Sequence, residues 1–109
     1  MKVSTLIENI IATAEDKFGY TQHNLDCISV YTYVNPGNNN WQVGLMRPSE
    51  GQLDSGDIPT DKAYTIKQSD NLFAFLIERD TLLGALLALQ ESVEEASDWT
   101  DGHLENYRP

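Results

Sequence analysis

Cysteine is almost absent from this chain, which has 109 residues and a single cysteine at position 27. One cysteine cannot form an intrachain disulfide, so packing and hydrogen bonds must hold the fold together. Cys27 begins a run of residues typical of a β-strand. We expect it to be a small buried hydrophobic residue.

Long apolar runs are also missing, because no stretch approaches the roughly 18–20 apolar residues needed to cross a membrane. The N-terminus, Met1 to Ser4, leads into a segment that contains Glu8, Glu15 and Asp16. These acids do not fit the apolar region of a secretory signal peptide. We therefore expect a cytoplasmic protein that has no membrane partner.

Basic residues are few: seven Lys and Arg stand against seventeen Asp and Glu, which gives a formal net charge of −10 and a pI near 4.3. The bases are scattered along the chain, at Lys2, Lys17, Arg47, Lys62, Lys67, Arg79 and Arg108. A nucleic-acid binder needs clustered Lys and Arg to displace counterions from phosphates. We therefore expect no direct binding to nucleic acid. The acidity either serves solubility alone or creates a field that attracts a basic partner.

Motifs of catalysis and of cofactor binding are absent as well: there is no H-E-x-x-H, paired C-x-x-C, Walker loop or dinucleotide glycine fingerprint. His23 and Cys27 would meet only on a helix, and their region is typical of a loop that enters a strand. Asp98, Asp101 and His103 are a candidate set for a divalent metal, but an acidic tail produces such a coincidence easily. We predict no enzyme activity and no cofactor, and assign no catalytic or metal-binding residue.

What the chain does contain is the composition of one globular domain, with 40% hydrophobic and 22% charged residues. Apolar residues recur every three or four positions from Val3 to Phe18, which predicts an amphipathic helix. Ser4 or Thr5 is expected to cap its start, and Gly19 to end it.

Two strand-like runs occupy 27–34 and 41–47, and the Asn- and Gly-rich turn between them predicts a hairpin. Gly44 in the second run is expected to mark a β-bulge or a close approach of another backbone. Residues 48–62 have no apolar period and predict a long loop. A short third strand is predicted at 63–68.

The densest apolar segment runs from Leu72 to Ala96 and is broken by three charged residues. Residues 72–77 are apolar on both faces, as in a central strand that is covered on both sides or lies against a partner. The alternative is one helix over 71–97. That helix would place the charge of Asp80 on its apolar stripe, so we favour a strand followed by a helix with Asp80 as its N-cap.

Together these elements predict an α+β fold with a four-stranded antiparallel sheet. The predicted order is helix–strand–strand–strand–strand–helix, with both helices packed on one face. Residues 1–109 are expected to form a single small acidic domain. Its segment 98–109 is an acidic tail that either folds back on the body or frays.

Acidic residues gather at the C-terminal end of the second predicted helix and in the tail. Several lie where the helix macrodipole disfavours negative charge, so stability alone does not favour the arrangement. Aromatic residues, which are enriched at the anchor points of interfaces, lie among them. A solvated helix end is the plainer explanation. The functional one is a partner-binding site made of Glu91, Glu94, Glu95, Asp98, Trp99, Asp101, Glu105 and Tyr107.

The function predicted from these features is a non-enzymatic acidic interaction module that binds, and blocks or sequesters, a basic protein partner, for example a nucleic-acid-binding protein. Bacterial and phage-encoded inhibitors and immunity proteins are similar in size and charge, an analogy that involves no shared motif. The alternative function is a small-molecule-binding or structural homodimer that uses the sheet face bearing Tyr31 and Tyr33.

Overall fold

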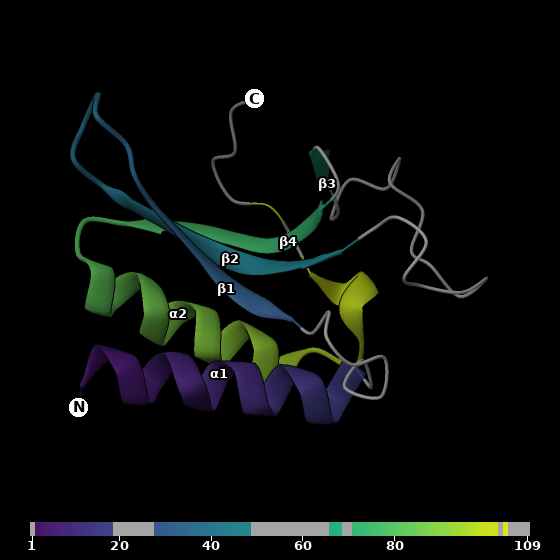
Figure 1. The fold of residues 1–109 in the computed structure, drawn as a ribbon. Coiled ribbons are helices and arrows are strands. Elements are labelled where there is room, and N and C mark those ends of the chain that lie inside the picture. Colours follow the sequence, from purple (N-terminus) through teal and green to yellow (C-terminus); the bar gives the residue numbers. More distant parts are fainter. Residues whose placement is uncertain (1, 19–27, 49–65, 69–70, 103, 105–109) are drawn as a thin grey trace.

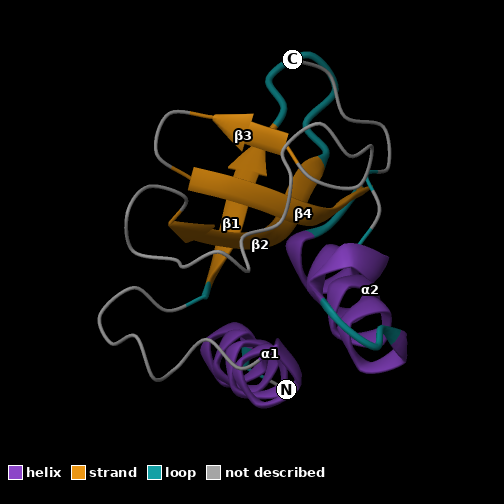
Figure 2. Ribbon diagram, turned by 90° about the vertical axis from the view of Figure 1, so that its right-hand side faces the viewer, coloured by secondary structure: helices purple, strands orange, loops and turns teal. Residues whose placement is uncertain are grey.

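The computed structural model describes residues 2–18, 28–48, 66–68, 71–102 and 104. Figure 1 shows the two helices side by side beneath the sheet, and Figure 2 shows from another direction that both lie on the same side of it. The elements are, in chain order, α1 (Val3–Phe18), β1 (Ser29–Val34), β2 (Trp41–Pro48), β3 (Ile66–Gln68), β4 (Asn71–Arg79), α2 (Leu82–Glu95) and the 3₁₀ turn η2 (Trp99–Asp101).

The sheet is antiparallel throughout, with the strand order β1-β2-β4-β3. The predicted α+β class is confirmed. In chain order the antiparallel strands follow one helix and precede the other, and the two helices pack against each other and on the sheet. Three of the strands are long, whereas β3 has only three residues. The predicted third strand, over 63–68, is observed at Ile66–Gln68, and positions 63–65 of its expected span lie outside the described residues.

β4 is the central strand that the sequence predicts, because it pairs with both β2 and β3. Five of its residues are at most 2% exposed: Leu72, Ala74, Phe75, Leu76 and Ile77. The competing single helix over 71–97 is wrong. Burial on both sides of the sheet outweighs the approximate helical spacing of these residues.

The turn between β1 and β2 is built from asparagines. The backbone N–H of Asn39 donates to the carbonyl oxygen of Asn35 at 2.7 Å, and Asn39 has a φ of 62°. Asparagine tolerates this left-handed conformation better than most residues. The side-chain amides of Asn38 and Asn40 both donate to the Glu78 carboxylate, at 3.2 and 3.0 Å. The tip of the hairpin is thereby attached to the end of β4.

Neither helix is capped by the predicted residue, and the two helices begin one to three residues away from the positions that the predicted caps imply. In α1 the carbonyl oxygen of Lys2 accepts the N–H of Leu6, so Ser4 and Thr5 lie within the first turn and neither of them caps it. The residue Gly19, expected to end this helix, lies outside the described residues.

In α2 the N-cap is Thr81 and not Asp80. The Thr81 backbone is extended, and its hydroxyl accepts the N–H of Gly84 at 3.0 Å. Asp80 precedes the cap by one residue. The predicted cap residue is therefore wrong by one position, and a side-chain oxygen caps a helix that starts one residue later than expected.

A β-bulge interrupts the pairing of β2 with β4 at Gly44, where the register shifts between Val43 and Leu45. A Cβ atom on Gly44 would lie 2.5 Å from Cδ2 of Leu76 and 3.1 Å from the carbonyl oxygen of Ala74. Both expectations for this glycine, the bulge and the close backbone approach, are therefore confirmed.

Phe75 is one of the two β4 residues opposite Gly44, and its φ of 61° is unusual for a bulky residue. The bulge reverses the side-chain alternation, so that Ala74 and Phe75 both belong to the core. The ring of Phe75 stacks on Phe18 of α1, with the centroids 5.8 Å apart. Left-handed backbone costs about 1–2 kcal/mol, which burial of a Phe side chain, worth about 1.5–3 kcal/mol, offsets.

Candidate partner-binding surface

The C-terminal end of α2 is fixed by a cation from α1. The Lys17 ammonium donates to the backbone carbonyl oxygens of Glu94 and Ala96, the second at 2.8 Å. The last carbonyls of a helix have no partner within the helix, and a cation there also favours the macrodipole. Lys17 therefore joins the two helices and satisfies two of the carbonyls at the end of α2. This role was not predicted from the sequence, although α2 has no basic residue in its own last turn.

The turn after α2 is closed by Asp101. Its carboxylate accepts the backbone N–H of Ser97 at 2.5 Å and that of Asp98 at 3.4 Å. The Asp101 N–H in turn donates to the Asp98 carbonyl oxygen at 3.1 Å. Asp101, although exposed, is thus held in place by the local backbone and shapes the turn.

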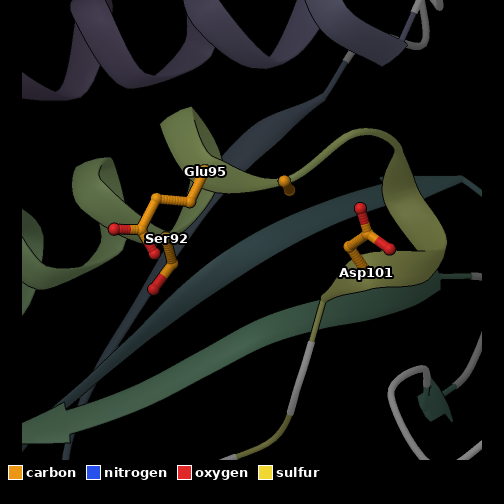
Figure 3. Close-up of a pocket in the computed structure, with 4 residues that line it drawn as sticks. Ser92, Glu95 and Asp101 are labelled. Atoms are coloured by element: carbon orange, nitrogen blue, oxygen red, sulfur yellow. The ribbon is translucent and has the colours of Figure 1, made fainter.

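A shallow pocket lies between this turn and the helix, lined by Ser92, Glu95, Ala96 and Asp101. Figure 3 shows Ser92 and Glu95 on α2, with Asp101 across from them on the turn. Two carboxylates border the pocket. Among the residues that the structure describes, no group of three His, Cys, Asp or Glu side chains is placed to hold a metal ion. His103, the third member of the candidate metal set, lies outside that part of the chain.

The predicted partner-binding residues are found in three different situations. Four of them are exposed at the C-terminal part of α2 and just beyond it, and we call these the acidic end: Glu91, Glu94, Glu95 and Asp98. Asp101 is exposed beside them. Glu105 and Tyr107 lie outside the described residues.

Trp99 is the exception, because it is only 1% exposed and lies in the core. Its ring makes edge contacts with Phe18 and Phe75, at centroid distances of 6.0 and 6.2 Å. The prediction that Trp99 contacts a partner is incompatible with this burial. The acidic residues around it in the sequence suggested a surface, but the apolar side of the turn faces the sheet.

Arg47 of β2 is the second residue whose role was not predicted. It is 2% exposed, and its guanidinium carbon lies 4.9 Å from the centre of the Trp99 ring. A cation over an indole face is favourable, the more so when it is desolvated. Val43, Leu45 and Arg47 alternate along β2, so the period of two places Arg47 on the core face. That signal was present in the sequence.

In the part of the chain that the structure describes, large apolar side chains are exposed at two places. On α2 they are Leu83 at 40% and Leu87 at 48%; on β1 they are Tyr33 at 46% and Val34 at 38%. Tyr33 stacks with Tyr31 of the same strand at a centroid distance of 6.5 Å. The helix leucines and the strand tyrosine lie on different elements and belong to two separate surfaces.

No protein-family model matches this chain, and neither a curated protein nor a solved structure is significantly similar to it. Within the described residues, neither helix has the length and apolar character needed to cross a bilayer.

Proposed function

We propose that this protein is a non-enzymatic interaction module that uses the acidic end of α2 to bind a protein partner with a basic surface. Binding blocks or sequesters that partner. The observation that carries the proposal is the outward exposure of all four acidic-end residues at a helix C-terminus, where negative charge does not favour stability.

The contact of Lys17 with α2 supports this interpretation. The Lys17 ammonium binds the carbonyl oxygens of Glu94 and Ala96, whereas an ionised carboxylate has no proton to donate to a carbonyl, so the acidic residues do not serve to cap the helix. A net charge of −10 adds long-range attraction for a basic molecule. A nucleic-acid-binding protein fits this description, because its binding surface is built to receive the negative charges of phosphates.

The test uses the tagged protein to capture a partner from the cells in which it is naturally made, at low and high salt. We expect capture at low salt and its loss at high salt, because salt screens charges near the surface. The triple variant Glu91→Lys/Glu94→Lys/Glu95→Lys should reduce capture at least about tenfold, since rim and hot-spot charges set both the rate and the strength of association.

A matched control comes from α1, where Glu8→Lys/Glu15→Lys/Asp16→Lys makes the same change in charge. Three substitutions of two charge units each bring either variant from −10 to −4. The control should retain the partner. Retention by the α2 variant, or equal loss in both variants, would show that the acidic end is not the binding site. The captured protein should also lose its own ligand binding when the wild-type protein is added.

A second candidate function is a homodimer or a small-molecule site on the Tyr-bearing sheet face. It is favoured by a row of aromatic side chains in which Tyr31 stacks with Tyr33 and contacts Phe73 edge-on at 5.3 Å. Sedimentation equilibrium of the wild type and of Tyr33→Thr tests the dimer. A wild type that stays monomeric at all concentrations would remove the dimer form of this candidate.

A further inference from the structure

The outward face of α2 changes character along its length. Four exposed residues lie on it at spacings of four, four and three, and we call them the outer stripe: Leu83, Leu87, Glu91 and Glu94. Residues at these spacings share one face of a helix. At a rise of about 1.5 Å per residue the stripe is roughly 16 Å long. Its first half is apolar and its second half is acidic.

The core does not account for the two leucines of the stripe. The residues that α2 buries lie on its other side: Ala85, Leu86, Leu89 and Val93. Leu83 and Leu87 remain 40% and 48% exposed, although a polar residue at either position would serve a solvated helix face. Single exposed leucines are ordinary. Two neighbours one turn apart, continuous with the acidic end, form a surface of mixed chemistry.

We propose that the outer stripe docks a basic amphipathic helix of the partner. This inference rests on the proposed function and specifies the partner's chemistry. A helix packed along α2 repeats its side chains with the same three- and four-residue spacing. Its contact face carries apolar residues at one end, against the leucines. At the other end it carries Lys or Arg, against Glu91 and Glu94.

Charge favours this occupant over a second copy of the chain, whereas the small area of the two leucines limits both. Each copy carries a net charge of −10, so two copies repel. Two half-exposed leucines supply only a small part of the about 800 Å² that each partner buries in a stable interface. A basic helix adds electrostatic attraction at the acidic end, which a second acidic copy does not. The polar residues at the edge of such an interface then exclude water from the contact between the leucines and the apolar side chains of the partner helix.

The probe for the test is a helix-stabilised synthetic peptide as long as α2, with leucines in one half of one face and lysines in the other half of that face. The comparison peptide has the same composition, rearranged so that leucines and lysines lie around the whole helix. Binding is measured by fluorescence anisotropy. We expect the patterned peptide to bind at least about tenfold more tightly than the rearranged one.

Leu83→Gln/Leu87→Gln removes the apolar half and keeps a good helix former at both positions. This variant should bind the two peptides with affinities within about twofold of each other. The matched control, Tyr33→Thr/Val34→Thr, removes the exposed apolar side chains of β1 and should keep the tenfold preference.

Equal binding of both peptides by the wild type would overturn the docking inference. If that binding were salt-sensitive and lost in Glu91→Lys/Glu94→Lys/Glu95→Lys, the proposed function would stand without it. A wild type that binds neither peptide also overturns the inference, whereas the capture experiment decides the proposed function separately. Light scattering that shows a dimer, lost in Leu83→Gln/Leu87→Gln, would assign the stripe to a second copy instead.

Discussion

The two helices lie side by side on the same face of the sheet, yet they present different surfaces to the outside. Both bury an apolar stripe, with Leu6 and Ile10 of α1 and Leu86 and Leu89 of α2 all fully buried. The most exposed side chains of α1 are small, polar or charged, namely Ser4, Thr5, Glu8, Asn9, Ala12, Asp16 and Lys17. Its apolar residues Val3, Ile7 and Ile11 are only partly exposed. The outer stripe of α2 carries leucines and glutamates. Packing on the sheet requires an apolar inner face on both helices. It does not require their outer faces to differ.

The chain beyond α2 returns to the core at Trp99, which packs beside the end of α1. Trp99→Ala should cost about 3–5 kcal/mol of unfolding free energy, since it opens a cavity beside Phe18 and Phe75 and removes the ring beneath Arg47. Urea denaturation followed by circular dichroism measures the change. A loss below about 0.5 kcal/mol, the range typical of surface positions, would show that Trp99 is exposed in solution and would make it a candidate partner contact again.

The contact between the helices provides the second test. Lys17→Met keeps the aliphatic stem but removes the ammonium that binds the carbonyls of Glu94 and Ala96. We expect a loss of about 1 kcal/mol, because charge-assisted hydrogen bonds contribute more than neutral ones but this group is partly solvated. Lys2→Met is the control, since Lys2 is also exposed and directly precedes α1. If the two variants lose the same stability, Lys17 does not hold the end of α2.

Local patterns were enough to predict much of the fold. The stripe of α1 follows from helical spacing, the hairpin from the Asn-rich turn, and the bulge from Gly44. Each of these depends on residues close together in the chain. In α2 the cap was displaced because Asp80 and Thr81 stand next to each other, and only the geometry of the chain selects the one that caps. In α1 the helix begins at Val3, before both predicted caps, so neither Ser4 nor Thr5 is used.

The candidate site was predicted less well, for a reason that Trp99 and Lys17 share. Their roles depend on partners far away in the sequence: Phe18 and Phe75 for the tryptophan, and the end of α2 for the lysine. Sequence neighbours indicate an acidic surface around Trp99, whereas packing against the sheet buries it. Arg47 differs, because the alternation along β2 already places it on the core face.

The smallest expected effect concerns the outer stripe itself. Leu83→Gln/Leu87→Gln should change the unfolding free energy by no more than about 0.5 kcal/mol at each position, because both side chains are about half exposed and Gln is a good helix former. Leu86→Ala, on the inner face of the same helix, should cost about 2–5 kcal/mol. Thermal and urea unfolding of the two variants give the comparison. If Leu83→Gln/Leu87→Gln is as destabilised as Leu86→Ala, the two outer leucines serve the stability of the fold. The docking proposal then loses the observation that supports it. If Leu83→Gln/Leu87→Gln hardly changes the unfolding free energy, stability does not explain why the outer faces of α2 and α1 differ. Binding to a partner is then the explanation that the peptide experiment tests.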